Sequence, residues 1–442
     1  MNYQTGVVRS DEATDPPNSD QKATTFQLIS WAFFDWANSA FATVVQTFIF
    51  AAYFTNRVAA SETSGTMQWG NTLSIAGIIV ALIGPVLGAL ADQGGRRKPW
   101  IAVFTVLCVI SMASLWFVKP SSSYLRLALI LVALGTVTSE CAMIFYNSML
   151  PAMVKPDNMG RWSGWGWSLG YAGGLMCLVF CLFAFVKTEN PWFFLDNDSA
   201  QNVRAAFVFA AAWHMLFVLP LLLFTPDTRS TGKSLFRALR DGLQQLRDSI
   251  RRIRRYSNIV RFLIARMIYI DGLATVFAFG GIYAAGTFDM NAQQVLIFGI
   301  ALNVTAGLGA AGFGWIDDRI GPKHTILISL AGLIISGTAI LLVHSTALFW
   351  TFGLILGVFV GPVQASSRSF LGRIAPEHLR SQMFGLYALS GKATSFIGPL
   401  MVGWITAWTC SQRIGMSATI VLFFIGAILM LAVSTSREKV SG

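Results

Sequence analysis

Apolar side chains in this chain gather into twelve long blocks, and short polar segments separate one block from the next. A helix needs about 20 residues, at 1.5 Å per residue, to cross roughly 30 Å of hydrocarbon, and each block is about that long. Lipid offers no hydrogen-bond partners, so only helices or closed barrels cross it, and continuous apolar runs lack the alternation of barrel strands. The pattern therefore predicts an all-α polytopic membrane protein with twelve transmembrane helices.

The predicted spans form two groups of six around a polar gap. Their approximate residues are 28–56, 69–91, 99–118, 124–149, 161–186 and 203–225, then 259–286, 292–316, 324–343, 347–369, 381–408 and 414–435. This division gives a polar N-terminal tail (1–27), a first six-helix bundle (28–225), a linker (226–258), a second six-helix bundle (259–435) and a C-terminal tail (436–442).

The charges of the chain decide its orientation. Only 12% of the 442 residues are charged, and the formal charge of +11 resides in short loops between spans, so we expect no nucleic-acid partner. With both termini in the cytoplasm, 24 of the 32 Lys and Arg residues, Arg368 and Arg373 among them, fall on the cytoplasmic side. No signal peptide is visible in the polar start. We expect a monomer in the bacterial inner (cytoplasmic) membrane with both termini cytoplasmic; in a eukaryote the place would be a vacuole-like compartment.

The linker predicts an amphipathic helix. Apolar side chains recur in it at steps of three and four residues, at Leu235, Leu239, Leu243, Leu246, Ile250 and Ile253, and arginines occupy the other faces. Such a helix suits the anionic inner leaflet, which makes membrane lipids the expected partner. A calmodulin-like or nucleic-acid target is the alternative, and it needs more assumptions.

One loop motif occurs twice, 226 residues apart, after the second and the eighth span. It has the spacing Gly-x-x-x-Asp-x-x-Gly with basic residues near its end. Its copies contain Gly88, Asp92, Gly95, Arg96 and Arg97, then Gly314, Asp318, Arg319 and Gly321. Asp35 in span 1 and Asp271 in span 7 are a second repeated feature, and the Pro-Asp and Pro-Glu pairs at 156–157 and 376–377 are a third. Three features repeated at equivalent positions argue for two pseudo-symmetric halves.

These motifs, with the basic linker, resemble the major facilitator superfamily across nearly the whole chain. Residues 34–41 (FDWANSAF) and 91–98 (ADQGGRRK), with Tyr146, Asn147, Leu150 and Pro151, look like its vacuole-effluxer-like branch, which includes the fungal autophagy-related amino-acid effluxers. Gln93 departs from the superfamily, many members of which have a basic residue there. The resemblance implies two rocking bundles around a midplane substrate site lined by spans 1, 4, 7 and 10. It also implies that Asp92 and Asp318 act as latches, which accept hydrogen bonds from helix N-termini or pair with arginines.

Five ionisable side chains fall within the predicted spans: Asp35, Glu140, Arg266, Asp271 and Lys392. Each costs about 2.5–3.5 kcal/mol on insertion scales, so each needs a partner or a purpose. Asp35 or Glu140 could carry a coupling proton, with Arg266 as the natural partner, or the charges could form a permanent pair that fixes helix packing. Arg266 could instead hold a substrate carboxylate in bidentate fashion. For Asp271 and Lys392 the packing role is favoured.

Neutral polar side chains complete the candidate site: Asn38, Gln46, Tyr146, Asn147, Asn303 and Gln364. Each can hydrogen-bond either a substrate or a neighbouring helix, and the helix contact is favoured for most of them. For Tyr146 and Asn147 the family string favours the cavity. We expect no metal site and no cofactor, because the five cysteines show no metal-ligand spacing.

No nucleotide-binding loop is visible, so any uphill transport must draw on an ion gradient. The first hypothesis is a secondary, proton-coupled or facilitative transporter of small solutes, with amino acids or similar metabolites as the substrates that the family implies, and efflux as the expected direction. The second is a transport-inactive membrane receptor or scaffold that acts through its basic linker. An enzyme is not expected, because His214 and His344 are isolated and no set of nucleophile, base and orienting group is visible.

Overall fold

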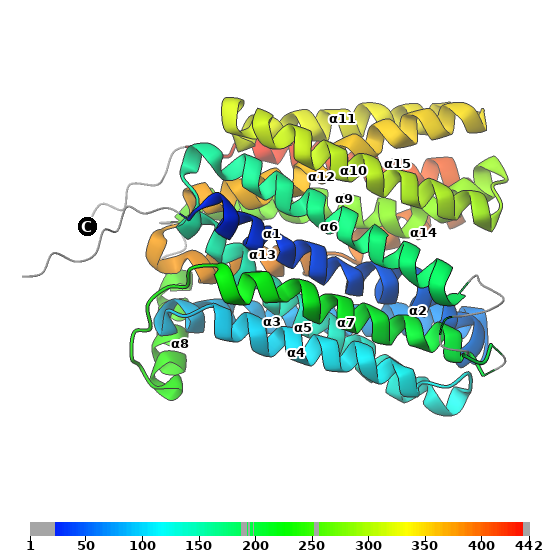
Figure 1. Ribbon diagram of the computed structural model, residues 1–442. Helices are drawn as coiled ribbons and strands as arrows, with labels where there is room; N and C mark the ends of the chain where they lie inside the picture. Colours follow the sequence, from blue (N-terminus) through cyan, green and yellow to red (C-terminus); the bar gives the residue numbers. More distant parts are fainter. Residues whose placement is uncertain (1–22, 187–191, 193–194, 198, 252–255, 436–442) are drawn as a thin grey trace, which may run out of the picture.

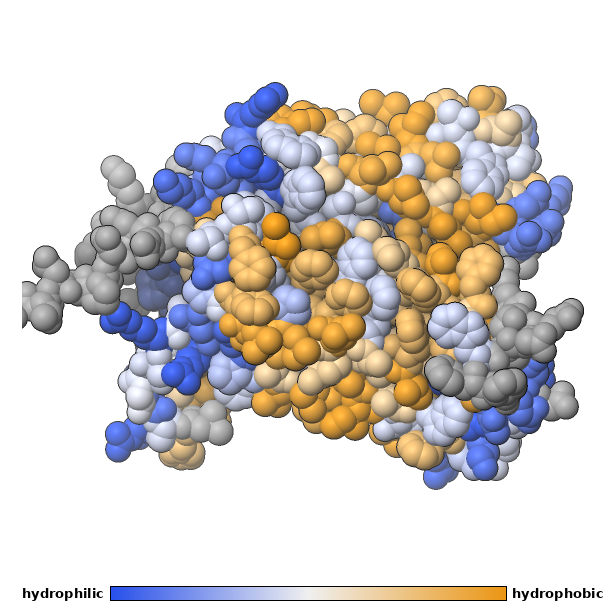
Figure 2. All heavy atoms as spheres, viewed as in Figure 1, coloured by the Kyte–Doolittle hydropathy of each residue, from blue (hydrophilic) through white to orange (hydrophobic). Residues whose placement is uncertain are grey.

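The computed structural model describes residues 23–435 except 187–191, 193–194, 198 and 252–255. Most of the predicted N-terminal tail, the C-terminal tail, and Ile253 with its neighbouring arginines lie outside the described residues. Long helices run side by side through the molecule (Figure 1). Hydrophobic side chains form a band across its middle, and polar side chains gather at both ends, as a membrane-embedded protein requires (Figure 2).

The helices before the linker form the N half. They are α1 (Thr25–Ala40), the π-helical η1 (Phe41–Phe48), α2 (Ile49–Tyr53), η2 (Phe54–Val58), α3 (Glu62–Gly94), α4 (Lys98–Ser114), α5 (Leu125–Met153), α6 (Met159–Cys181) and α7 (Gln201–Phe224). Span 1 thus continues from α1 through η1, α2 and η2 as one helical segment, Thr25–Val58. The π-helical stretch accommodates the length that hydropathy indicated for this span, and π-helical turns are frequent at functional sites.

The helices after the linker form the C half. They are α9 (Ser257–Phe288), α10 (Ala292–Ile320), α11 (Pro322–Leu342), α12 (Thr346–Ile374), α13 (Arg380–Lys392), α14 (Ile397–Thr409) and α15 (Gln412–Leu431). Within the described residues, eleven helices are long and apolar enough to cross a membrane, and α13 with α14 makes the twelfth span. All twelve predicted spans are therefore present.

The eleventh span is broken, which the sequence interpretation of 381–408 as one helix missed. Pro399 stands in the first turn of α14, where its missing N–H costs nothing. The backbone N–H of Gly398 donates to Asp271 over 3.0 Å, so a carboxylate from α9 stabilises the new helix start. Asp271 therefore has a structural contact at the break.

The linker helix α8 (Leu235–Arg251) lies across one end of the bundle, close to where the described chain begins and ends (Figure 1). We call this the α8 end. Gly242 packs against the backbone of Ala89 on α3, while Phe236, Leu239 and Leu243 are exposed. An apolar stripe on a helix that crosses the bundle end is the arrangement of an interfacial helix.

Candidate functional site

A cavity of about 290 Å³ lies between the two halves. Helices α1, η1, α5 and α6 of the N half and α9, α12 and α13 of the C half line it. The predicted lining by spans 1, 4, 7 and 10 is correct, and spans 5 and 11 contribute in addition. From span 5 the lining residues include Trp167 and Gly170 on α6, and from span 11 they include Tyr387, Gly391 and Lys392 on α13.

A buried ion pair crosses the cavity from one half to the other. Arg368 on α12 donates from one terminal nitrogen to Asp35 on α1 over 3.0 Å, and the side chains are 1% and 7% exposed. The Tyr146 hydroxyl donates to the same carboxylate oxygen over 2.7 Å. A buried charge pair needs such additional hydrogen bonds to offset its desolvation.

Groups of the N half bind the Arg368 guanidinium. It donates to the Ser163 hydroxyl over 2.9 Å, to the Ser163 carbonyl over 2.7 Å and to Asn147 over 3.2 Å. Gly166 provides the space for this ion pair, because a Cβ there would lie 2.6 Å from the Asp35 carboxylate and 2.8 Å from the guanidinium. One arginine of the C half is therefore inserted into a polar pocket of the N half.

Two expectations are corrected here. The cation beside Asp35 is Arg368, not Arg266, and Arg368, which we counted on the cytoplasmic side at the very end of predicted span 10, is buried between the halves. Hydropathy ended span 10 at residue 369 because Ser366, Ser367, Arg368 and Ser369 form a polar string, but α12 continues to Ile374 with these four side chains buried. An arginine among small residues at the expected end of a span is the signal that would have found it.

A second ion pair joins the two halves. Lys392 on α13 lies 2.7 Å from Glu140 on α5, and each side chain is 32% exposed. Both residues line the cavity. This pair is therefore in reach of water, unlike the pair between Asp35 and Arg368.

Arg266 on α9 lines the cavity without an acidic partner among the described residues. Its guanidinium lies over the Tyr387 ring, 3.4 Å from the centroid. One terminal nitrogen donates to the Tyr387 carbonyl and to the Ser390 hydroxyl, each over 2.7 Å. The predicted pairing of Arg266 with a carboxylate is thus absent in the described part of the chain.

The neutral candidates divide into three sets. Asn38, Gln46, Asn147 and Gln364 line the cavity, and each hydrogen-bonds a neighbouring side chain: Ser139, Thr136, Arg368 and Tyr171, respectively. Tyr146 is fully buried behind the ion pair. Asn303 donates to the Gly299 carbonyl of its own helix and lines a different, largely apolar cavity of about 610 Å³, formed mainly by the C half with Thr47 and Phe48 of η1, so the structure does not bring it to the central cavity.

The first loop motif joins α3 to the start of α13 at the α8 end. The Asp92 carboxylate accepts from the backbone N–H groups of Ser381 over 2.9 Å and Gln382 over 2.8 Å, in the first turn of α13. Gly88 lies against the same turn, because an added Cβ would overlap the Ser381 carbonyl. The predicted hydrogen bonds to a helix N-terminus are present, and they cross from one half to the other.

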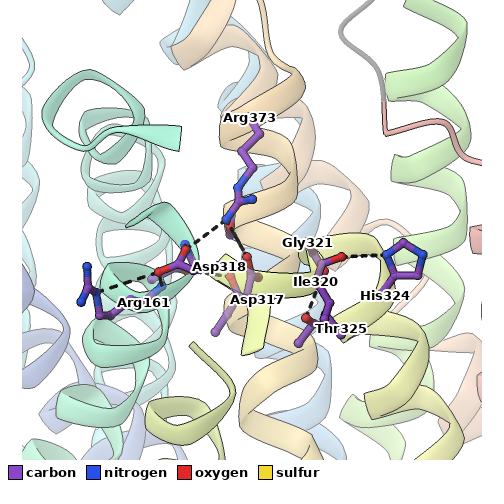
Figure 3. A network of polar contacts seen from close by, with 12 residues as sticks. Arg161, Asp317, Asp318, Ile320, Gly321, His324, Thr325 and Arg373 are labelled. Atoms are coloured by element: carbon purple, nitrogen blue, oxygen red, sulfur yellow. Dashed lines mark hydrogen bonds and ion pairs between the residues drawn. The ribbon is translucent and has the colours of Figure 1, made fainter. Parts of the chain in front are cut away.

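The second copy makes the same contact in the opposite direction. Asp318 at the end of α10 accepts from the backbone N–H groups of Gly160 over 2.8 Å and Arg161 over 3.1 Å, in the first turn of α6. Arg373 binds Asp318 over 3.2 Å and its neighbour Asp317 over 2.8 Å (Figure 3). Asp317 and Arg373 were not predicted as site residues, because a second aspartate is absent from the first copy and Arg373 fell in a predicted loop.

The motif glycines serve two purposes that recur in both copies. Gly88 and Gly314 allow close helix contact between the halves, Gly314 against Arg161. Gly95 and Gly321 have φ of +83° and +88° and end their helices in a conformation that favours glycine. Of the basic residues, Arg97 is buried and donates to the Ser381 hydroxyl over 3.2 Å, while Arg96 and Arg319 are exposed.

Comparisons with known proteins agree with this architecture. A family profile described as "Vacuole effluxer Atg22 like" matches residues 58–442. An uncharacterized MFS-type transporter of Bacillus subtilis, YxiO, is 27% identical over 92% of this chain and 95% of its own length. Autophagy-related protein 22 of Saccharomyces cerevisiae is 23% identical over 76% of this chain and 70% of its own length.

Solved structures show the same fold. The proton:xylose symporter XylE matches with a TM-score of 0.72 at 14% identity, over 94% of this chain and 96% of XylE. The transporter FucP, in its outward conformation, matches with a TM-score of 0.71 at 13% identity, over 92% and 98%. The chain is thus a membrane transporter with the major facilitator superfamily fold. Within that superfamily it belongs to the vacuole effluxer Atg22-like family.

Proposed function

We propose that this protein is a proton-coupled secondary transporter that moves small solutes, amino acids or related metabolites, across a bacterial inner membrane by alternating access. The observation that carries the proposal is the buried pair of Asp35 and Arg368, which lies at a cavity between the halves and joins one half to the other. An alternating-access carrier needs contacts of this kind, which form in one state and break in the next.

The α8 end is the cytoplasmic end in this proposal, and the described conformation is closed there. The excess of Lys and Arg in the loops at this end supports the orientation. Asp92 and Asp318 both accept hydrogen bonds from the opposite half at this end. Cytoplasmic opening would break both latches together with the ion pairs between the halves.

Proton coupling follows from what separation does to Asp35. While Arg368 is inserted, the carboxylate is neutralised by a full positive charge. Once the halves separate, Asp35 is left beside the cavity without that charge, where it can take up a proton before Arg368 returns. Glu140 is a second carboxylate with an opposite-half cation, and efflux would follow if substrate enters from the α8 end.

Flux into proteoliposomes tests the proposal. Radiolabelled amino acids are followed with and without an imposed pH gradient, for the wild type, Asp35→Asn and Glu140→Gln. We expect the gradient to drive accumulation in the wild type and Asp35→Asn to lose that response while retaining exchange. Accumulation that ignores the gradient, or that both variants retain in full, would contradict proton coupling.

The alternative of a scaffold finds support in the contacts of α8. Gln245 hydrogen-bonds Gln93 of the N half and Gln382 of the C half, so the linker contacts both. A scaffold, however, has no use for a polar cavity between the halves. Removal of residues 234–255 separates the two hypotheses, because a carrier should retain flux and a scaffold would lose its activity.

A further inference from the structure

The positive charges of the central cavity outnumber the negative ones. Five ionisable side chains line it: Asp35, Glu140, Arg266, Arg368 and Lys392. Asp35 pairs with Arg368, and Glu140 pairs with Lys392. The positive charge of Arg266 therefore has no acidic partner among the described residues that line the cavity. The described cavity therefore carries one uncompensated cation at a fixed place.

Arg266 is buried and held in position by neutral groups. It is 8% exposed, its guanidinium lies on the Tyr387 ring, and it donates to the Tyr387 carbonyl and the Ser390 hydroxyl. Its Nε has no hydrogen-bond partner among the described residues. Gly391 makes the space, because a Cβ there would lie 3.2 Å from one terminal nitrogen. These contacts orient the guanidinium and leave donors unused.

We propose that Arg266 binds the carboxylate of a small organic monocarboxylate, and that this carboxylate is the group by which the transporter recognises its substrate. The inference rests on the proposed transport function and adds the substrate class to it. A guanidinium presents paired donors that match a carboxylate, and a buried cation with donors to spare gains most from an anion. The volume of about 290 Å³ lies just below the range usual for drug-sized ligands, which limits the substrate to a small metabolite.

The other lining groups decide between two members of this class. A simple acid would place its apolar part against Ile144, Ile270 and Phe384. An amino acid would in addition need an acceptor for its ammonium group. Gln364 lines the cavity with its amide nitrogen bound to Tyr171, so its side-chain carbonyl could supply that acceptor. The carboxylate anchor is common to both.

Ligand-dependent stability of the purified full chain tests the inference directly. The probes are L-alanine, L-leucine, L-lactate and 4-methylpentanoate, each compared with its primary amide, and the readout is the unfolding midpoint against probe concentration. We expect at least one acid to raise the midpoint and its amide to have no effect. If the amino acids alone bind, the ammonium group is recognised too.

Two variants test whether the stabilisation by acids depends on Arg266. Arg266→Gln should abolish the response to acids, and Arg266→Lys, which keeps the charge but loses the paired donors, should weaken it about tenfold. Arg413→Gln is the matched control, because Arg413 also lies over an aromatic ring and donates to backbone carbonyls but is not among the residues that line the cavity. That variant should keep the response whatever its own stability.

Three results would overturn the inference: no acid raises the midpoint, the amides act as strongly as the acids, or Arg266→Gln binds acids as the wild type does. If Arg266→Gln does not fold, Arg266→Lys and the acid–amide comparison still decide. Flux measured in parallel keeps the two proposals apart. Acid binding without transport contradicts the proposed function alone, whereas transport that does not distinguish acid from amide contradicts the inference alone.

Discussion

Arg368 of the C half and Asp35 of the N half lie 3.0 Å apart, nitrogen to oxygen, with both side chains almost fully buried. Because each half supplies one charge, the pair reports whether the halves are together on the α8 side. Separation would leave two charges without their partners, which is costly unless a proton or water reaches them. In the proposed transport cycle, the pair would therefore link the conformation of the protein to proton binding at Asp35.

The first prediction concerns the strength of this pair. Asp35→Asn or Arg368→Gln alone should lower the free energy of unfolding by about 3–5 kcal/mol, because each leaves a buried charge unpaired. The double variant removes both charges and should be more stable than the sum of the single effects implies. A double-mutant cycle from thermal unfolding in nanodiscs measures this coupling. Additive effects would show that the two side chains do not interact.

The second prediction uses the glycine that makes room for the pair. Gly166→Ala places a methyl group within 2.6 Å of the Asp35 carboxylate, so the pair must shift or break. We expect slower substrate exchange in proteoliposomes and a lower unfolding midpoint. Gly312→Ala is the control, since nothing lies within 4 Å of a Cβ there. Equal behaviour of the two alanine variants would contradict the packing argument.

The third prediction separates the two ion pairs. Glu140 and Lys392 are 32% exposed, and partly exposed pairs contribute only about 0–1 kcal/mol, so Glu140→Gln should change stability little. The charge-reversed variant Glu140→Lys should impair exchange, because two cations would then face each other across the cavity. Exchange should recover in the double variant Glu140→Lys with Lys392→Glu. If it does not, Glu140 has a role other than pairing.

The fourth prediction concerns α8. Gln245 accepts from Gln93 and donates to Gln382 over 2.9 Å, and Lys233 donates to Gln93 over 2.6 Å. Gln245→Ala should loosen α8 and speed trypsin cleavage at its arginines about two- to tenfold, as expected from the loss of about 1 kcal/mol of hydrogen bonding. Gln244→Ala is the control, because the Gln244 side chain is exposed. Unchanged cleavage of Gln245→Ala would show that these contacts do not hold the helix.

Those contacts also explain the departure at Gln93. Many superfamily members have a basic residue there, and in this chain Lys233 of the linker brings a positive charge to the same place. The sequence alone showed the missing charge. It could not show the replacement, because Lys233 lies 140 positions away in the chain.

The spans were predictable because hydropathy is summed over about 20 residues, so single polar residues change the result little. The same averaging concealed two local features of the helices. It passed over Pro399, where span 11 breaks, and it ended span 10 at residue 369, directly after Arg368, although α12 continues to Ile374 and buries that arginine. Both errors occurred where a helix carries polar or helix-breaking residues for a functional or local structural reason.

The candidate site was predictable in part. Insertion cost alone pointed to Asp35, Glu140, Arg266 and Lys392, and all four line the cavity. Their pairing was not predictable, because it depends on how the helices of one half are rotated and shifted against the other. Asp271 shows the same limit, since its symmetry with Asp35 in sequence does not carry over to the cavity.

The central claim is that the α8 end opens and closes as the halves rock. Spin labels at Lys155→Cys and His378→Cys, one on each half at that end and both at exposed positions, allow the distance to be measured by electron–electron double resonance after Cys410→Ser removes the exposed native thiol. We predict a dominant short distance in this background and a second, longer distance once Asp92→Asn and Asp318→Asn remove both latch charges. A single unchanged distance in both proteins would contradict the account.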